Sequence, residues 1–268
     1  MSEGKVEDLV IYPIKGCRGV HLDKVKLTPM GMEGDREFTL LLDGKRVSQS
    51  QLPSLAKLDA KYLDSSKMAL SYPGMKPLVF STLEGRRSDS MKVFDQSVPL
   101  LMMEERVCKW LSDALGTQVE LAKMVNAMEW NIPLSEFDEI NRKQQSKFID
   151  ASPLLLTNSA SLEELNVRLS DPVPMDRFRA NIVVSGLKAY EEDDIQEYHF
   201  PDALLKRVTV CERCIVTTID QETGLKAKEP LLTLSKYRRR EGGYAGGIMF
   251  GMYLTAAQSG FLTVGDRL

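Results

Sequence analysis

Two cysteines three positions apart, Cys211 and Cys214, have the greatest chemical potential in this sequence. A Cys-x-x-Cys pair can be a thioredoxin-like redox centre, half of a zinc site, two structural thiols, or one thiolate ligand for a soft metal with a supporting partner. Residues 215–219 are rich in β-branched side chains and predict a strand, whereas the redox centre needs a helix there. Arg213 could stabilise a thiolate or clamp an anionic cofactor group. The structural and metal-ligand interpretations stay open.

Basic residues stand where predicted strands begin or end. Arg177 and Arg179 precede an apolar run at residues 181–185, and Arg36 precedes another at 37–42. The planar guanidinium suits phosphate, and Asn181 offers both a donor and an acceptor. Lys15 and Gly16 lie in a loop after the first strand, where backbone N–H groups can also hold phosphate. Each feature alone fits a solvated charge cluster, but together they predict one shared anionic ligand.

Composition excludes several other functions. The 268 residues are 43% hydrophobic and 27% charged, with a net charge of −3, so a nucleic-acid partner is not expected. No apolar run reaches the ~18 residues that a transmembrane segment needs. Four cysteines are too few for a disulfide scaffold, and His21 and His199, the two histidines, exclude an all-histidine metal site. The acidic N-terminus lacks an apolar core, which predicts a cytoplasmic protein, or a mitochondrial one if a targeting segment precedes this sequence.

The elements that must position these residues are mostly short strands. Turn residues separate the strands of the first half, and Asp43-Gly44 predicts a hairpin. We expect a mainly β fold with a few helices (α+β), as a barrel or sandwich. A long connection at residues 123–147 is expected to flank the site. Strands are predicted at 5–11, 24–27, 37–42, 58–63, 68–71, 90–93, 181–185, 205–210, 215–219 and 261–264; helices are predicted at 104–115, 161–169 (capped by Ser159 or Ser161) and 230–237.

The chain resembles the MOSC-domain family, specifically its two-part members with an N-terminal MOSC-type β-barrel. It is most similar to the mitochondrial amidoxime-reducing components and bacterial proteins of that kind. The resemblance implies a MOSC-type β-barrel at residues 123–268 packed with an N-terminal β-barrel-like domain at residues 1–122. The matching motifs cover nearly the whole chain in the family's order: 11–19 (IYPIKGCRG), 34–36 (GDR), 177–186 (RFRANIVVSG), 211–218 (CERCIVTT), 228–238 (KEPLLTLSKYR), 250–253 (FGMY) and 264–266 (VGD).

The same resemblance implies a molybdenum cofactor, that is, molybdenum held by the dithiolene of molybdopterin. The second cysteine of the pair, Cys214, would be the metal ligand and catalytic residue. Four departures from the family pattern concern the site. Gly16 replaces a frequent Ser, Ala180 a usual Pro and Ala151 a usual Thr, and residues 48–51 (SQSQ) replace a segment that more often includes Arg. The implied cofactor-binding residues are Lys15, Gly16, Arg36, Ser152, Arg179, Asn181, Arg213 and Tyr253.

The activity implied is reduction of N-hydroxylated compounds, such as amidoximes and hydroxylamines, by oxygen-atom transfer. Electrons would come from a separate protein, either cytochrome b5 with its reductase or a ferredoxin- or flavodoxin-type donor. The alternative is a molybdenum-cofactor-binding or sulfur-carrier module without redox turnover, similar to the C-terminal part of molybdenum-cofactor sulfurase. Pyridoxal-phosphate binding belongs to the desulfurase domain of that sulfurase, and this sequence shows no such domain. A purely structural interaction module would not need the ordered set of cations.

Overall fold

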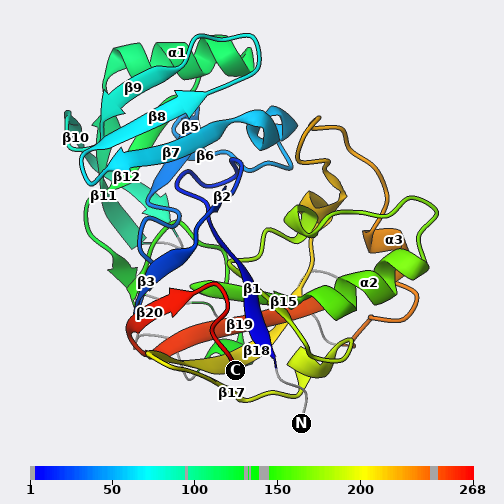
Figure 1. Ribbon diagram of the computed structural model, residues 1–268. Coiled ribbons are helices and arrows are strands. Elements are labelled where there is room, and N and C mark those ends of the chain that lie inside the picture. The colour runs from blue at the N-terminus through cyan, green and yellow to red at the C-terminus, as the bar shows by residue number, and fades with distance from the viewer. Residues whose placement is uncertain (1–3, 94–95, 130–131, 133, 139–144, 242–246) are drawn as a thin grey trace.

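The structure is a computed structural model that describes residues 4–93, 96–129, 132, 134–138, 145–241 and 247–268, with the side chains of 88–96 left out. Two β-rich parts lie side by side (Figure 1). Their strands outnumber the helices, which confirms the predicted mainly β, α+β class. No helix of the described residues is long and apolar enough to cross a membrane.

The larger sheet forms the lower right part of Figure 1. Many of its apolar side chains are fully buried, including those of Leu9, Leu154, Ile182 and Leu254. The parallel strands β15 and β16 are joined through α2 (Ser159–Val167), and β1 pairs antiparallel with β16, with Leu9 opposite Ile182. The first strand of the chain is thus part of a sheet built from the second half. In spatial order the strands are β17 (Glu197–Phe200), β18 (Ala203–Glu212), β19 (Met249–Gln258), β15 (Leu154–Asn158), β16 (Ile182–Ser185), β1 (Lys5–Ile11) and β2 (Val20–His21).

The smaller part is built from a five-stranded and a three-stranded sheet. Helix α1 (Glu105–Leu115) places Val107, Leu111 and Leu115 one turn apart, and all three are buried in a core shared with Phe38. Gly116, with φ of 69°, ends the helix in the left-handed conformation. The strands are β10 (Gly85–Val93), β11 (Gln96–Met103), β12 (Glu120–Met124), β5 (Phe38–Leu42) and β6 (Lys45–Arg46), then β7 (Asp59–Asp64), β8 (Lys67–Ser71) and β9 (Leu78–Ser81), with the 3-10 helix η1 (Pro53–Lys57) beside them.

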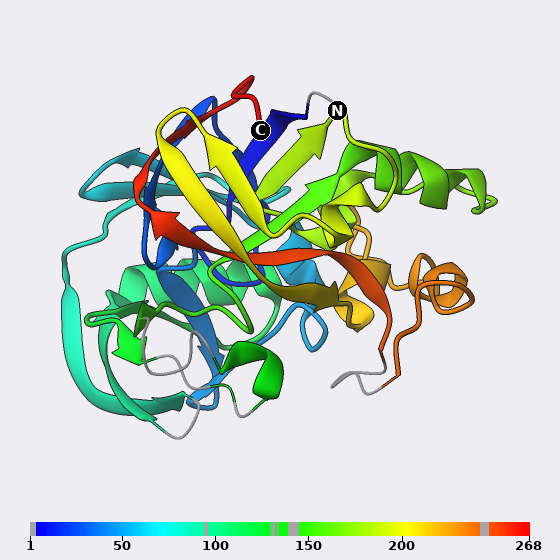
Figure 2. The ribbon, with the colours of Figure 1, turned by 90° about the horizontal axis from the view of Figure 1, so that it is seen from below.

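Short elements join the two parts. Strand β20 (Gly260–Thr263) pairs with β3 (Lys24–Thr28), which also pairs with β4 (Gly31–Met32), so the end of the chain is tied to its beginning. Figure 2 shows β18 (yellow) and β19 (orange-red) running beside each other towards this junction. The remaining elements are β13 (Met128–Glu129), β14 (Gln145–Ser146), α3 (Leu231–Leu234), and the 3-10 helices η2 (Ser135–Phe137), η3 (Met175–Phe178), η4 (Glu191–Asp193) and η5 (Ile215–Thr218).

Several predicted elements are confirmed. The helices predicted at 104–115 and 161–169 are α1 and α2, and the hairpin at Asp43-Gly44 joins β5 and β6 with both residues at positive φ. The cap of α2 differs from the prediction, because the side chain of Asn158 accepts the hydrogen bond from the backbone N–H of Ala160. The long connection contains β13, β14 and η2, while residues 130–131, 133 and 139–144 of it lie outside the described residues.

The strand predicted at residues 215–219 is wrong, because Ile215–Thr218 forms the 3-10 helix η5. The hydroxyls of Thr217 and Thr218 donate to the carbonyls of Cys214 and Ile215, three residues back, which closes tight turns that a strand cannot make. Local side-chain to backbone hydrogen bonds thus outweigh the β-propensity of this run. The chain therefore turns sharply at Cys214.

Gly251 provides a test of how tightly β19 packs on β15. Its φ is 81°, and an added Cβ would lie 2.7 Å from the carbonyl oxygen of Leu156. We expect Gly251→Ala to lower the free energy of unfolding by about 2–4 kcal/mol. The loss has two causes: alanine is strained in the left-handed conformation, and its Cβ would clash with the Leu156 carbonyl. Urea denaturation measures this. The matched control is Gly74→Ala, which has a φ of 80° but no atom within 4 Å of the added Cβ, and should cost about 1 kcal/mol. Equal losses at the two positions would contradict the proposed clash.

Candidate functional site

One cavity of about 340 Å³ brings together all nine residues predicted for the site. They come from the loop after β1, the residues before β5 and β15, the two ends of the η3–β16 turn, the end of β18 and the middle of β19. Separate segments that each looked weak in the sequence therefore meet in space. The nine are Lys15, Gly16, Arg36, Ser152, Arg179, Asn181, Arg213, Cys214 and Tyr253.

Lys15 and Gly16 leave β1 and turn into the cavity. The backbone N–H of Lys15 donates to the carbonyl of Phe38 at 2.8 Å, which fixes this loop on β5. The Lys15 Nζ lies 2.7 Å from Asp150 Oδ1, and its side chain is 11% exposed while that of Asp150 is 77% exposed. Burial lowers the pKa of Lys15, and Asp150 opposes this shift. Gly16 has a φ of 85°, a left-handed conformation that glycine adopts without strain.

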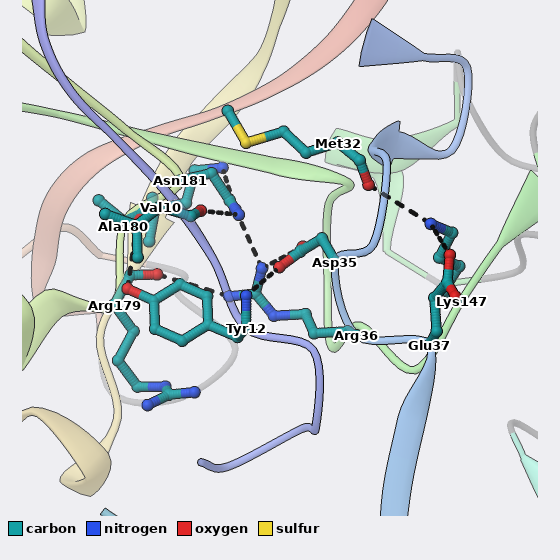
Figure 3. Close-up of polar contacts among 11 residues, drawn as sticks. Val10, Tyr12, Met32, Asp35, Arg36, Glu37, Lys147, Arg179, Ala180 and Asn181 are labelled. Carbon is teal, nitrogen blue, oxygen red and sulfur yellow. Dashed lines mark hydrogen bonds and ion pairs between the residues drawn. The ribbon is translucent and has the colours of Figure 1, made fainter. Parts of the chain in front are cut away.

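Two arginines share one aromatic ring (Figure 3). The guanidinium carbons of Arg36 and Arg179 lie 4.6 Å and 4.2 Å from the ring centroid of Tyr12. Both arginines have positive φ, 48° and 53°, which is uncommon for residues with a Cβ. Arg36 pairs with Asp35 and donates to Asn181 Oδ1 at 3.1 Å, while Arg179 donates to the Cys17 carbonyl at 2.8 Å. The backbone at Arg36 and Arg179 thus adopts an unfavourable conformation in which both guanidiniums lie against Tyr12.

The charges of these two arginines are unequally compensated. Burial opposes the charge of Arg36, but the ion pair with Asp35 raises its pKa overall. Burial lowers the pKa of Arg179, and the nearby charge of Arg36 lowers it further. An arginine stays protonated at physiological pH, so the charge of Arg179 remains buried at a cost in free energy. A nearby anion would offset that cost.

The two cysteines of the pair have different environments. Cys211 is buried, its Sγ accepts a hydrogen bond from Arg213 Nη1 at 2.7 Å, and it also hydrogen-bonds Tyr253. Burial raises the pKa of its thiol. Cys214 is exposed on the cavity wall, in an extended conformation at the start of η5. The structure thus separates a supporting thiol from an accessible one.

Arg213 is fixed between the two cysteines. Its Nη2 donates to the carbonyl of Phe178 at 2.6 Å, and its backbone N–H donates to Ile248 at 2.7 Å. Its Nε is buried and has no hydrogen-bond partner among the described residues. Within the same residues no group of three or more His, Cys, Asp or Glu side chains is arranged to hold a metal ion.

The polar residues of the predicted site are already engaged by the protein. Asn181 donates to the Val10 carbonyl at 3.0 Å and its Oδ1 accepts from the backbone of Leu155 at 3.3 Å. Ser152 donates to the Leu254 carbonyl at 2.8 Å. Both side chains thus hold strands of the cavity wall together, so any cofactor contact would be additional to this structural work.

Comparison with known proteins gives matches along nearly the whole chain. Residues 3–118 match the MOSC N-terminal beta barrel domain and residues 143–268 match the MOSC domain. The chain is 33% identical over 276 residues to "Mitochondrial amidoxime reducing component 2" of Bos taurus, covering 98% of this chain and 82% of that protein.

The chain belongs to the MOSC-domain family. It is also 34% identical over 279 residues to "Mitochondrial amidoxime-reducing component 1" of Homo sapiens, with 98% of this chain and 82% of that protein covered. "Molybdenum cofactor sulfurase" of Oryza sativa subsp. japonica is 31% identical over 273 residues, which cover 95% of this chain and 33% of that protein.

Further residues of this MOSC protein line the cavity and were not predicted. Asp150 lies two positions before the predicted residue Ser152, and this proximity in the sequence was the available signal. Gln49 lies in the segment already noted as a departure from the family pattern. Glu212 is buried beside Arg213 and its Oε1 accepts a hydrogen bond from the backbone of Gly247. The aromatic residue Tyr12 lies beneath the arginines.

Thiol reactivity tests the separation of the cysteines in this MOSC protein. The native chain without cofactor should release about one equivalent of thionitrobenzoate rapidly from Ellman's reagent, because Cys214 is exposed while Cys17 and Cys211 are buried. Denaturation should release the remainder. Cys214→Ser should abolish the rapid phase and the half-buried Cys108→Ser should leave it intact. A rapid phase that survives Cys214→Ser would contradict this assignment.

The Lys15–Asp150 pair predicts a pH dependence of stability. Burial alone would raise the pKa of Asp150, but Lys15 and its hydrogen bond lower it overall. Since the folded-state pKa lies below the unfolded value near about 4, the stability from this carboxylate is complete above that value and is lost as the pH falls through the folded-state pKa. Asp150→Asn should therefore flatten the dependence of unfolding free energy on pH below about pH 5. Urea denaturation from pH 3 to 7 measures it, with the exposed Asp113→Asn as control. An unchanged slope would argue against the pair.

Proposed function

We propose that this chain binds a molybdenum cofactor through Cys214 and reduces N-hydroxylated compounds, such as amidoximes and hydroxylamines, by oxygen-atom transfer. The observation that carries the proposal is one cavity in which an exposed thiol meets four cationic side chains. Thiolate is a ligand for soft metals, and guanidinium and ammonium groups bind phosphate. The printed names of the relatives, amidoxime-reducing components and a molybdenum cofactor sulfurase, support the same choice.

The residues present fit a large anionic group. Arg213 Nε is buried without a partner in the described part of the chain, and burial and Arg36 together lower the pKa of Arg179. A phosphate beside these groups would supply the missing acceptor and offset the like charges. Asp150 adds a carboxylate that is 77% exposed, which could accept hydrogen bonds from the amino groups of a pterin.

The proposed roles of the residues follow from these positions. Cys214 would be the metal ligand, while Arg179, Arg213 and Lys15 would bind the anionic groups of the cofactor. Gly16 would offer backbone N–H groups from its left-handed turn. Once bound, the cofactor would supply the two-electron oxygen-atom chemistry that no side chain here can perform.

The remaining roles belong to the cavity wall. Arginines cannot act as acids at neutral pH, so their task would be to orient and to compensate charge. Reduction of an amidoxime consumes two electrons and two protons and yields an amidine and water. The cavity would have to admit these protons together with the substrate.

The partners follow from the same proposal. Electrons would come from a separate protein, either cytochrome b5 with its reductase or a ferredoxin- or flavodoxin-type donor. The substrates would be small N-hydroxylated molecules, and we propose no nucleic-acid partner, in keeping with the net charge of −3. The protein would act in the cytoplasm, or in mitochondria as the names of the relatives indicate for those proteins. The proposed division into domains at residues 1–122 and 123–268 leaves the cavity at their junction.

A second function stays open because of one specific likeness. The chain is 31% identical to a molybdenum cofactor sulfurase over 95% of its length. An exposed cysteine beside an arginine could also carry sulfur or hold the cofactor without redox turnover. Turnover of an N-hydroxylated substrate decides between the two functions.

Metal content and activity test the proposal together. Protein purified from a host that makes the cofactor should contain molybdenum and pterin in near-equimolar amount and reduce benzamidoxime with a reduced electron donor. Cys214→Ala should lower the activity by at least about 100-fold, because the metal loses its protein ligand. Cys211→Ala should lower the activity by no more than about tenfold, because Arg213 keeps its bond to Phe178. Mass spectrometry for molybdenum, pterin fluorescence and amidine formation are the measurements.

The outcomes separate the two functions. Wild-type protein that contains neither molybdenum nor pterin would contradict the proposal that the chain binds this cofactor. Cofactor without turnover of benzamidoxime or a hydroxylamine would favour the cofactor-binding or sulfur-carrier function. Equal losses in Cys211→Ala and Cys214→Ala would contradict the distinction between the supporting and the ligating thiol.

A further inference from the structure

Two buried glutamine side chains from distant parts of the chain pair with each other beside the cavity. Gln49 Nε2 donates to Gln221 Oε1 at 2.9 Å, and Gln221 Nε2 donates to Gln49 Oε1 at 3.0 Å. The two residues are 2% and 5% exposed and 172 positions apart. Gln49 follows β6, whereas Gln221 follows η5, so this amide pair joins the two β-rich parts.

The remaining hydrogen bonds of the amide pair reach residues of the site. Gln49 Nε2 also donates to the Gly16 carbonyl at 3.0 Å, and Gln221 Nε2 donates to the Ile219 carbonyl at 2.9 Å. Arg179 Nη1 donates to Gln221 Oε1 at 3.3 Å. Gln49 lines the cavity with Gly16 and Arg179, while Gln221 lines a second cavity behind it. The amide pair therefore stands in the wall between the two cavities.

These hydrogen bonds fix the orientation of both amides, that is, the positions of the oxygen and the nitrogen of Gln49 and of Gln221. Both N–H bonds of each amide have an acceptor, so rotating either amide by half a turn would place N–H groups against N–H groups. Gln221 Oε1 must then face Arg179, and the second bond of the same Nη1, to the Cys17 carbonyl, holds the guanidinium from the other side. A neutral acceptor directs this arginine without cancelling its charge, whereas a carboxylate would neutralise it.

We propose that the Gln49–Gln221 amide pair is a positioning element that holds Arg179 and the Gly16 loop in the geometry for binding a phosphate group in the cavity. The inference rests on the proposed function for the identity of the ligand, but not for the geometry. Neither glutamine touches the reacting atoms; both act through Arg179 and Gly16. The phosphate can belong to a pterin cofactor or be free in solution, and the test distinguishes these sources.

The decisive variant replaces both glutamines by methionine, which has a similar length and no hydrogen-bonding amide. Removing both partners leaves no unsatisfied group between them, although the carbonyls of Gly16 and Ile219 each lose a donor. Gln49→Met with Gln221→Met should therefore lower the unfolding midpoint less than Gln221→Met alone does. Gln221→Met alone should lower that midpoint, because it leaves the buried amide of Gln49 without its partner. Gln196→Met, at an exposed glutamine away from the cavity, is the matched control.

Two readouts follow on the full-length chain. Titration of cofactor-free protein with inorganic phosphate, followed by calorimetry well below the unfolding midpoint of each variant, should show about tenfold weaker binding in the double variant. Pterin content after expression in a host that makes the cofactor should fall in the same variant, while Gln196→Met matches the wild type in both. A loss of pterin without a loss of phosphate affinity would overturn the proposed phosphate role of the pair.

Two further results would also overturn the inference: phosphate binding by the double variant as tight as that of the wild type, or no phosphate binding by the wild type. Wild-type protein that binds phosphate but holds no pterin would instead contradict the proposed function. In that case weaker phosphate binding by the double variant would still support the positioning role.

Discussion

The antiparallel pairing of β1 with β16 is the constraint on which the cavity depends. It inserts the first strand of the chain into a sheet made by the second half, with Leu9 opposite Ile182. Because β1 and β16 run antiparallel, the loop carrying Lys15 leaves the sheet at the edge where Arg179 and Asn181 enter it. Asn181 reinforces the pairing by donating to the Val10 carbonyl at 3.0 Å. The cavity therefore cannot form in either half alone, and its residues come together only when the whole chain folds.

This assembly holds several buried cations close together before any ligand is bound, which costs free energy. Asp35 compensates Arg36 and Asp150 compensates Lys15, but burial and Arg36 still lower the pKa of Arg179. Buried charges are costly unless they are paired and hydrogen-bonded. The buried guanidinium of Arg179 keeps an uncompensated charge, which would favour the binding of an anion beside it. The neutral amide oxygen of Gln221 accepts a hydrogen bond from Arg179 and aligns it without cancelling its charge. The guanidinium can therefore still attract an anion.

Much of this site was predictable because its residues belong to short motifs at strand ends. Lys15, Arg36 and Arg179 were each found from a cation beside an apolar run, and strand ends gather at one edge of a sheet. The turn at Cys214 was not predicted, because the hydroxyls of Thr217 and Thr218 override the β-propensity of their run. The partner of Gln49 could not be found either. It lies 172 positions away, and nothing in the sequence around a lone glutamine says what its amide will meet.

The end of β18 separates the two cysteines of the motif. β18 ends at Glu212, and the 3-10 helix η5 begins at Ile215, so Cys211 lies within the strand and Cys214 lies outside it. Cys211 then stays in the sheet, where it binds Arg213 and Tyr253, while Cys214 is carried onto the cavity wall. The hydroxyls of Thr217 and Thr218 close the turns that follow Cys214, so the bend that the strand prediction missed lies next to the accessible thiol.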